Sequence, residues 1–525
     1  MNRSAPTSIA FFQPPGRMPA PSRARVQGGL LAALLGSASI AAVAWLTQQF
    51  GAPIALALLV AAWAASMMLL HPVLATGLTL FLLYVNFPAI LTKQHGIPEA
   101  AAGVFVLLLG IPLLHRMGAA RARPRADTTL YLMVAFLFVS AVSSLTAIDH
   151  QAAFMRLEVF FFEGVLLYWL VINAVPDLAA LRRAIWTLLA AGALLSALSL
   201  YQDVTGSYSQ EFGGLAYRNY APEEEEAPTD RRSKWDRAQG PVNEPNRFAQ
   251  VLIVLVPLAV FLFRTPRSRL LRASAAAAGS LIVIGILLTL SRGAIVTLAM
   301  MAAAMVTLKW LRPPHLTAAG AALVLALPLL SPYLLPRLQS LSAVGALIEG
   351  DTAAYRRQAD GAMLGRTTAM LSALRVFLDH PALGVGPGQF SKFYVLEYST
   401  DPDIKFRQLT TARRAHNLYL EIAAETGAVG LTVFLAIFAV LLRRLKEARR
   451  RVLTSHPELA DLLAAFWLAI AAYLCTAMFL HLSYQRYLWL LLALAGAALS
   501  IASPPQVDAA APRRRRQAAF AGGRA

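Results

Sequence analysis

Residues 427–442 read GAVGLTVFLAIFAVLL, and residues 443–451 directly after them read RRLKEARRR. An apolar run of this kind predicts a helix that crosses the hydrocarbon core of a bilayer, for which roughly 20 mostly apolar residues suffice. A basic cluster at the end of such a run is typical of the cytoplasmic end of a membrane span. We therefore expect this helix to run from the outer face of a membrane to its inner face.

The composition of the whole chain supports the same interpretation. Of its 525 residues, 57% are hydrophobic and 14% are charged, whereas soluble globular domains carry about 25% charged residues. This excludes a disordered protein and argues against a soluble enzyme. The one cysteine, Cys475, excludes a disulfide framework, a zinc ribbon or an iron–sulfur cluster supplied by this chain alone.

Fourteen stretches are candidate membrane spans by the same criterion. They are 28–48, 52–70, 72–91, 98–115, 128–147, 157–175, 184–202, 247–263, 273–290, 293–311, 316–336, 427–442, 460–480 and 485–502. His71-Pro72 separates the second from the third so narrowly that they form either two spans or one broken or re-entrant element. The spans on either side of Ser291-Arg292 are equally close. The expected fold is an all-α polytopic membrane protein with 12–14 transmembrane helices.

Basic residues divide the connections into two kinds. With the N-terminus in the cytoplasm, the inner segments carry more than half of the 47 basic residues and about a fifth of the 28 acidic ones. The positive-inside rule thereby explains the formal net charge of +19, and no nucleic-acid partner is needed. The runs 443–451 and 513–516 are interpreted as anchors beside anionic lipid. The polar N-terminal residues precede an uncleaved first span, with a cleaved signal peptide as the alternative.

The spans and connections divide the chain into seven parts. They are an inner tail (1–27), an N-terminal transmembrane bundle (28–202), an outer loop (203–246), transmembrane helices that include a Ser-Arg-Gly motif (247–336), a large outer loop (337–426), C-terminal transmembrane helices (427–502) and a basic inner tail (503–525). Loops as long as the second outer one are usually functional. The acidic run at 223–226 in the first outer loop is a solvated stretch or, alternatively, a cation site.

Two features of the large outer loop bear on function. From Arg366 to Leu378 apolar residues recur every three or four positions, which predicts an amphipathic helix that ends before His380-Pro381. We expect this helix to lie at the outer mouth of the bundle, either as a lid that only packs or as part of a site. The following segment, GVGPGQF at 384–390, is a plain turn or a cradle in which the amides of Gly386 and Gly388 hold a phosphate oxygen.

The segment HNLYLEIAAETG at 416–427 leads directly into the apolar run described first. His416 and Asn417 are therefore expected at the outer membrane–water boundary, at the start of a helix. Glu421 and Glu425 lie one turn apart on one face of that helix. The segment is either a reactive site or an interfacial histidine followed by carboxylates that suit the positive end of the helix dipole.

Three further polar groups stand out against the apolar spans. Arg292 lies where two spans meet at the outer surface, and it is either functional or an arginine that snorkels to water. Glu163 lies a few residues inside a span, as a functional carboxylate or as the partner of an arginine. In GPVNEPNRF, we expect Asn243, Asn246 and Arg247 to cap the span that follows.

Four segments together resemble the O-antigen ligase and O-antigen polymerase superfamily of bacterial inner-membrane glycosyltransferases. They are NEPNRFA (243–249), TLSRGA (289–294), RTTAMLSALRVFLDHPALGVGPGQF (366–390) and HNLYLEIAAETGAVGL (416–431). The resemblance implies a multi-span helical bundle in which 337–426 is a large periplasmic catalytic loop. It also implies transfer of a glycan from undecaprenyl diphosphate to an acceptor hydroxyl, with no metal or other cofactor.

The same resemblance implies roles for three residues. The family's catalytic histidine matches His416, the arginine of its SRGA-type motif matches Arg292, and the arginine of its loop helix matches Arg366. Arginine forks suit the oxygens of a diphosphate leaving group, and a histidine that titrates near neutrality suits removal of the acceptor's proton. We therefore predict these three as catalytic, with inversion in one displacement. The predicted substrate-binding residues are Gly386, Gly388, Asn417, Glu421, Glu425 and Arg247.

Several interpretations remain open at this point. A ligase transfers the glycan to lipid A–core, a polymerase transfers it to another lipid-linked repeat, and related proteins glycosylate proteins or build exopolysaccharide; we favour the ligase. A polysaccharide or solute transporter would carry charges near mid-bilayer on paired broken helices, whereas most polar clusters here lie at the outer boundary. A structural scaffold leaves the outer loops unexplained.

The expected partners are the lipid-linked donor, the acceptor and membrane lipid. The expected location is the bacterial inner membrane, with the site facing the periplasm.

Overall fold

The structure is a computed structural model of the 525-residue chain. It describes residues 71–95, 105–119, 123–218, 237–265, 268–311, 343–359, 361–394, 406, 414–481 and 486–503. The chain divides into two compact units, Met1–Leu70 and His71–Ala525, and every described residue belongs to the second. The expected spans at 28–48, 52–70 and 316–336, the acidic run at 223–226 and both tails lie outside the described residues.

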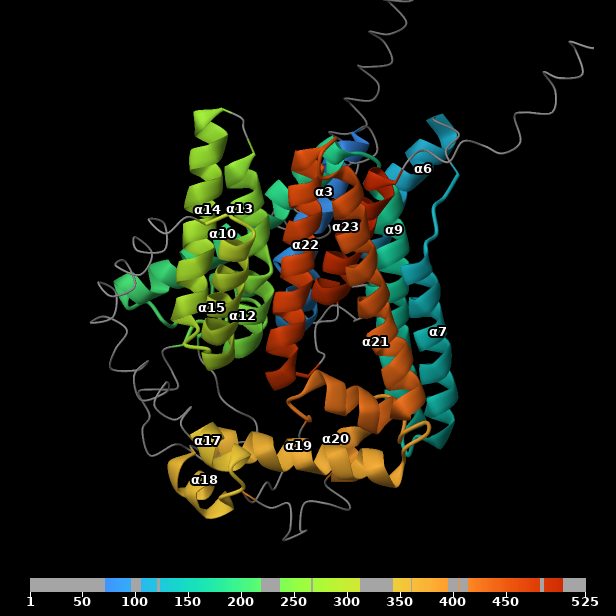
Figure 1. Ribbon diagram of the computed structural model, residues 1–525, viewed down its shortest axis with the longest axis vertical. Helices are drawn as coiled ribbons and strands as arrows, with labels where there is room; N and C mark the ends of the chain where they lie inside the picture. The colour runs from blue at the N-terminus through green and yellow to red at the C-terminus, as the bar shows by residue number, and fades with distance from the viewer. Residues whose placement is uncertain are drawn as a thin grey trace, which may run out of the picture. The chain divides into compact units, whose positions relative to one another are not determined.

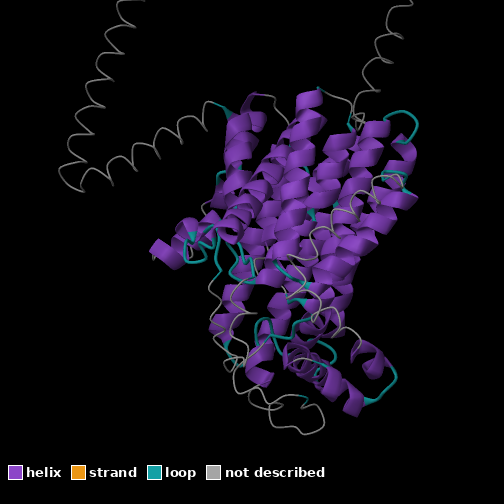
Figure 2. Ribbon diagram, turned by 90° about the vertical axis from the view of Figure 1, so that its left-hand side faces the viewer, coloured by secondary structure: helices purple, strands orange, loops and turns teal. Residues whose placement is uncertain are grey.

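The described residues form helices joined by turns, with one isolated bridge between Tyr217 and Gly240 and no strand in these ranges (Figures 1 and 2). The α-helices are α3 (Pro72–Tyr84), α4 (Phe87–His95), α6 (Gly110–Ala119), α7 (Thr128–Ser143), α8 (His150–Phe160), α9 (Leu167–Ala174), α10 (Leu178–Thr205), α12 (Pro245–Ile253), α13 (Leu255–Arg264), α14 (Arg269–Leu288), α15 (Arg292–Thr307), α17 (Ala343–Ile348), α18 (Thr352–Gln358), α19 (Gly361–Asp379), α20 (Phe390–Phe393), α21 (Leu418–Val452), α22 (Pro457–Thr476) and α23 (Arg486–Ala502). A π-helical turn, η2 (Phe161–Leu166), joins α8 to α9.

Within the described ranges, seven helical segments are long and apolar enough to span a bilayer, or up to eight with a bent pair. The pair is α3 and α4, which meet at an angle of 53°. The break lies at Asn86, whose φ is 63°, and Pro72 instead begins α3. Three further apolar helices are shorter, namely Phe105–Gly118, α15 and α23. The expected all-α polytopic fold class is confirmed, and the full number of spans stays a prediction.

Aspartate side chains cap the starts of several described helices, α7, α8 and α10 among them. The carboxylates of Asp127, Asp149 and Asp177 accept hydrogen bonds from backbone amides in the first turns of α7, α8 and α10, at 2.8–2.9 Å. Such a cap satisfies a donor that has no partner within the helix. At α12 the cap is Glu244, which accepts from the amides of Asn246 (3.2 Å) and Arg247 (2.6 Å). The expectation that the asparagines cap this helix is therefore wrong, because the longer carboxylate reaches both amides.

One end of the bundle collects the arginines that the sequence assigns to inner segments. Arg444 near the end of α21 lies 3.9 Å from Asp127 at the start of α7. Arg264 at the end of α13 lies 3.5 Å from Asp461 near the start of α22, and Arg182 of α10 pairs with Glu458. The ends of these helices are thereby tied together, and the other end of the bundle is left for the residues described below.

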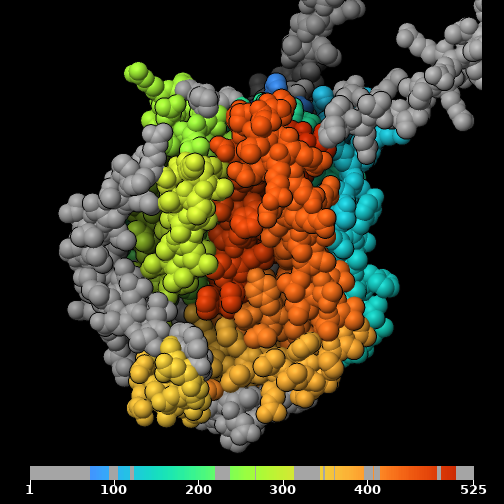
Figure 3. Space-filling model, in the orientation of Figure 1, coloured from blue at the N-terminus to red at the C-terminus, as the bar shows by residue number. Residues whose placement is uncertain are grey.

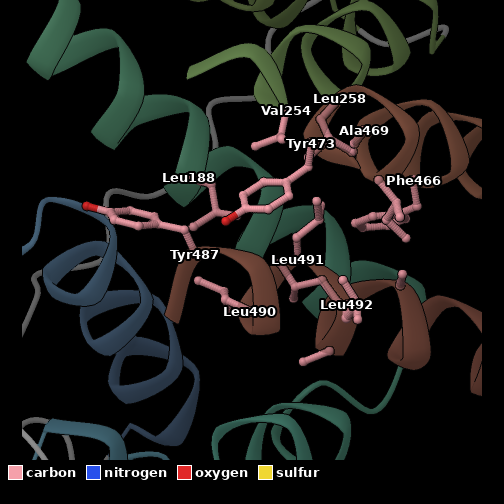
Figure 4. Close-up of a cluster of buried hydrophobic side chains, with 14 of the residues drawn as sticks. Leu188, Val254, Leu258, Phe466, Ala469, Tyr473, Tyr487, Leu490, Leu491 and Leu492 are labelled. Carbon is pink, nitrogen blue, oxygen red and sulfur yellow. The ribbon is translucent and has the colours of Figure 1, made fainter. Parts of the chain in front are cut away.

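The core lies where α9, α10, α12, α13, α22 and α23 pack together. Figure 4 shows part of it, with Leu188, Leu258, Phe466 and Tyr473 among leucines of α23. Two tyrosine hydroxyls tie the bent α3 to this core, because Tyr84 donates to Val251 O (2.7 Å) and Tyr487 donates to Tyr84 O (2.9 Å).

Glu163 forms an ion pair inside the bundle. Its carboxylate lies 2.6 Å from a guanidinium nitrogen of Arg486 at the start of α23, and both side chains are largely buried. The alternative that an arginine partners this carboxylate is therefore the one observed. A buried charge in a span needs such a partner, because an unpaired one is costly in hydrocarbon.

The described part of the large outer loop is mostly helical, and α17 to α19 extend over the other end of the bundle (Figure 3). α19 ends at Asp379 as expected, but its buried face consists of Gly365, Thr368, Ala369, Ser372, Ala373 and Val376. Leu374 (39% exposed) and Leu378 (60% exposed) point outward, so the expected apolar face is only partly correct. Small side chains face the protein because they permit close packing against α21.

Candidate active site

His416 lies in a segment that is held on both sides by buried polar groups. Before it, the carboxylate of Glu421 accepts hydrogen bonds from Arg414 Nε (3.1 Å) and the amide of Ala415 (3.2 Å), and Glu421 is 1% exposed. After it, Asn417 caps α21 by accepting from the amides at 419 and 420, each at 3.0 Å. His416 itself has φ 51°, a conformation uncommon for a residue with a side chain. Backbone strain maintained by its surroundings is typical of functional positions.

Glu425 braces the glycine-rich segment 384–390 against the first turns of α21. Its backbone carbonyl accepts from Gly386 N (2.9 Å), and its carboxylate accepts from the amides of Gly388 and Phe390, the latter at 3.4 Å. Ser143 Oγ at the end of α7 donates to the same backbone carbonyl (2.7 Å). Both glycine amides are thus engaged within the chain, the arrangement expected of a turn.

The glycine-rich segment and α21 approach each other closely at the backbone. A Cβ on Gly384 would lie 2.4 Å from the carbonyl carbon of Glu425, and one on Gly427 would lie 2.2 Å from the carbonyl oxygen of Ala382. Both glycines have positive φ, of 68° and 65°. Gly427 also breaks α21, so that the turns with Glu421 and Glu425 form a separate segment ahead of the long span. The helix begins at Leu418, nine residues before the expected start of the span.

Contacts at the start of α8 hold that helix, and with it Arg156, next to the glycine-rich segment. The side chain of Gln389 accepts from the amide of Asp149 and donates to its carbonyl, both at 3.0 Å, and Lys392 pairs with the Asp149 carboxylate. The hydrogen bond from Lys392 lowers the pKa of Asp149, so this exposed pair stays ionised. Arg156 then lies against the turn, since a Cβ on Gly388 would be 2.9 Å from its Cγ.

Arg247 and His481 join α12 to the segment that follows α22. Arg247 is 3% exposed, and its guanidinium donates to the carbonyl oxygen and to Nε2 of His481, both at 3.1 Å. The ring of His481 packs edge-on against that of His416, with centroids 5.5 Å apart. Burial, followed by the charges of Arg414 and Arg247, lowers the pKa of His481 well below its ordinary value. This imidazole is therefore neutral near pH 7.

Arg237 joins the two motifs NEPNRFA and TLSRGA. Its guanidinium donates to Thr289 O (2.7 Å) at the end of α14 and to Asn246 Oδ1 (3.0 Å) in α12. Arg292 begins α15 three residues after Thr289 and is half-buried. A Cβ on the next residue, Gly293, would lie 3.3 Å from the Phe479 ring, two positions before His481. The start of α15 is thus placed beside the His481 segment.

Arg366 lies on α19, half-buried beside its buried face. Two turns further along, Ala373 belongs to a small apolar cluster that includes Ala415, the residue before His416. At 1.5 Å per residue, about 10 Å of helix separates Arg366 from Ala373. The structure thus places Arg366 on the element that covers the site and gives it no hydrogen bond or ion pair among the described residues.

The structure brings His416, Asn417, Glu421, Glu425 and Arg247 together with the glycine turn. Asn417, Glu421 and Glu425 use their polar atoms on the chain itself. The sequence interpretation missed Arg156, Arg237, Arg414 and His481, which lie outside the quoted family motifs. The signal available for the first three was a basic residue in a segment expected on the outer side, where positive charge is disfavoured.

Two cavities among the described residues lie elsewhere. One of about 270 Å³ is lined by residues including Leu445 and Lys446 of α21, and another of about 160 Å³ by residues including Arg116 and Arg183. Both are at the arginine-rich end of the bundle. Within the described ranges, no three His, Cys, Asp or Glu side chains gather as a metal ion would require. The chemistry of the site described above is instead that of guanidinium groups around two imidazoles, which suits an anionic substrate.

The chain is thus an all-α polytopic membrane protein in which guanidinium groups lie around two imidazoles at one end of the bundle. Residues 277–435 match the family model described as O-antigen ligase. The matched segment contains Arg292, Arg366, His416 and Glu425, and it confirms the resemblance to the O-antigen ligase and polymerase superfamily. No curated protein matches the chain.

Proposed function

We propose that this protein is an integral membrane glycosyltransferase of the O-antigen ligase type. It transfers a glycan from undecaprenyl diphosphate to a hydroxyl of lipid A–core, on the periplasmic side of the bacterial inner membrane. The observation that carries the proposal is the strained His416, which packs on His481 beside Arg247 and lies within the family-matched segment.

In this reaction His416 is the general base. The acceptor hydroxyl oxygen attacks the anomeric carbon, and its proton passes to the imidazole of His416. The bond from the anomeric carbon to the diphosphate oxygen breaks, and the electron pair leaves with the diphosphate. One displacement of this kind inverts the anomeric centre. His481 is a poorer base, because its Nε2 lone pair already accepts a hydrogen bond from Arg247 and burial lowers its pKa.

Guanidinium groups stabilise the diphosphate as it leaves. Arg292 and Arg366 are assigned this role, and Arg247, which holds His481, adds a third positive charge. Fixed cations act most strongly on the charge that develops in the transition state, because they need no reorganisation. Gly386, Gly388, Asn417, Glu421 and Glu425 support these groups by holding the turn and the segment around His416 in place. In this proposal they position the site and do not bind phosphate directly.

The distribution of charge supports the proposed orientation. The arginine-rich ends of α10, α13 and α21 would face the cytoplasm by the positive-inside rule, which leaves His416 at the periplasmic face. There the polyprenyl chain of the donor stays in the bilayer while its glycan remains in water.

The proposal is tested with the purified full-length protein and an undecaprenyl-diphosphate-linked glycan. Lipid A–core is offered as acceptor in one reaction, and a second lipid-linked repeat in another. Transfer to lipid A–core supports the ligase, and chain extension of the lipid-linked repeat supports a polymerase of the same superfamily. Absence of transfer to every glycan acceptor, together with solute uptake into proteoliposomes without any glycan donor, would contradict a glycosyltransferase and support a transporter.

A further inference from the structure

His481 is absent from all four family-like segments, yet it contacts both His416 and Arg247. It follows α22 and η6 (Ala477–Phe479), ahead of the segment that leads into α23. We propose that His481 is a substrate-binding residue whose neutral Nδ1–H donates a hydrogen bond to a phosphate oxygen. This inference rests on the proposed function, and it names the group that this histidine recognises.

The tautomer of His481 follows from its contact with Arg247. The two nitrogens in question, Arg247 Nη2 and His481 Nε2, are 3.1 Å apart. A guanidinium carries only donors, so Nε2 must supply the lone pair and cannot carry a hydrogen. A neutral imidazole has one N–H, and it is therefore on Nδ1. The second donor of Arg247 binds the backbone carbonyl oxygen of the same residue, also at 3.1 Å.

The Nδ1–H of His481 is a buried donor that lacks an acceptor among the described residues. The atom is shielded from solvent and makes no hydrogen bond within the described part of the chain. A buried polar group without a partner is unfavourable, and native proteins rarely keep one without a reason. A bound ligand that supplies an oxygen acceptor removes this cost.

The charges that face His481 indicate what kind of acceptor it receives. Arg247, Arg414, Arg156 and His416 all act on this ring electrostatically, and each disfavours an additional positive charge there. Two carboxylates lie near these cations: Glu421 is already paired with Arg414, and Glu425 accepts from the amides of Gly388 and Phe390. A site with excess positive charge favours an anion, and a phosphate oxygen is the acceptor that a neutral N–H and an arginine fork bind together. The donor's diphosphate and a phosphate on the acceptor both offer this chemistry.

The test exploits the different reach of two amide side chains. In His481→Asn the amide nitrogen lies near the position of Nδ1, so the variant retains a donor toward the ligand and loses the acceptor for Arg247. In His481→Gln the amide oxygen reaches the position of Nε2, so this variant retains the acceptor for Arg247 and loses the donor toward the ligand. His456→Gln, an exposed histidine ahead of α22 at the opposite end of the bundle, is the matched control.

Binding of inorganic pyrophosphate to the full-length protein in detergent is measured first, because it does not depend on glycosyl transfer. We expect His481→Gln to weaken binding about tenfold or more, as for the loss of a hydrogen bond to a charged group, and His481→Asn and His456→Gln to remain within a few-fold of wild type. The inference is overturned if His481→Asn binds pyrophosphate more weakly than His481→Gln, or if both variants lose affinity equally. It is also overturned if neither variant loses affinity, or if wild type does not bind pyrophosphate. Melting temperatures of all variants are compared, and an unfolded His481→Asn is replaced by His481→Ser, which also retains a donor.

Steady-state kinetics then separate the two sources of phosphate. A higher KM for the undecaprenyl-linked donor in His481→Gln assigns the contact to the donor's diphosphate, and a higher KM for the acceptor assigns it to an acceptor phosphate. If the variants bind pyrophosphate in the expected order but the protein transfers no glycan, the inference about His481 stands and the proposed glycosyltransferase activity is rejected. Intact transfer with unchanged binding in His481→Gln rejects the inference alone.

Discussion

Glu421 and Arg414 form a buried ion pair directly ahead of His416, and Glu421 also accepts from the amide of Ala415. The sequence interpretation predicts that Glu421, like Glu425, binds substrate. The structure instead uses this carboxylate to shape the segment that presents the histidine.

Removal of Glu421 is therefore expected to destabilise the protein. Glu421→Gln leaves the Arg414 charge largely buried and unpaired, which costs roughly 3–5 kcal/mol and appears as a lower melting temperature in detergent. The matched control is Glu447→Gln, which breaks an exposed pair with Arg443 and costs less than about 1 kcal/mol. Equal effects of the two substitutions would show that the Glu421 pair is not a structural support.

His416→Ala is expected to lower the rate of glycan transfer by about 100- to 10,000-fold, the usual contribution of a general base. The side chain packs on His481 and carries no part of the core, so the variant should reach the membrane in normal amounts. Transfer is measured with the lipid-linked donor, and membrane content by immunoblot. Transfer at the wild-type rate would remove the residue from the mechanism.

Substitutions can distinguish a specific phosphate contact of Arg366 or Arg292 from a general effect of positive charge. Arg366→Ala is expected to reduce kcat/KM for the donor by tenfold or more, as for loss of a charge-assisted hydrogen bond. Arg375→Ala on the same helix, where the side chain is exposed, should leave it within twofold. Arg292→Lys should also be impaired, because an ammonium does not offer the planar fork of a guanidinium. A similar loss for Arg375→Ala would attribute the effect to the net charge of α19.

Gly384→Ala is expected to loosen the contact between the turn and α21. The new Cβ would lie 2.4 Å from the backbone of Glu425 at a positive φ, and the backbone strain alone costs roughly 1–3 kcal/mol. Gly345→Ala in α17 has open space around its Cβ and should be neutral or slightly stabilising. The melting temperatures and the transfer rates of the two variants provide the comparison, and an unaffected Gly384→Ala would show that this close approach is not needed.

The stability of the protein is expected to fall as the pH drops below about 6.5, the ordinary pKa of histidine. In the folded protein the pKa of His481 is lowered, first by burial and then by the surrounding cations. Below pH 6.5 the unfolded chain binds a proton that the folded chain does not, so folding loses free energy until the pH reaches the folded pKa. The melting temperatures of wild type and His481→Asn at pH 7.5 and 5.5 measure how much of the loss of stability comes from His481. If the melting temperature of wild type falls no more than that of the variant between these pH values, the prediction is wrong.

Much of the architecture was accessible from hydropathy and charge. The apolar runs predicted membrane spans over the described helices other than α17 to α20, because a bilayer allows few other ways to satisfy the backbone. The end of α19 at Asp379 followed from the proline after His380. The start of α21 was placed too late, because the turns with Glu421 and Glu425 are polar in sequence but buried against the glycine turn.

The motif residues His416, Arg292 and Arg366 were chosen by resemblance, and the chain order says nothing about their distances. Five residues distant in sequence lie near one another only because several helix ends meet on one side of the bundle. The residues are 156, 237, 247, 414 and 481, and the helices are α8, α12, α14, α21 and α22. Local sequence cannot encode that meeting, since it depends on side-chain packing between helices up to 300 residues apart. Composition and periodicity indicate which segments are apolar enough to enter a membrane. The way those segments pack decides that Arg247 holds His481 and that the ring of His481 lies against that of His416.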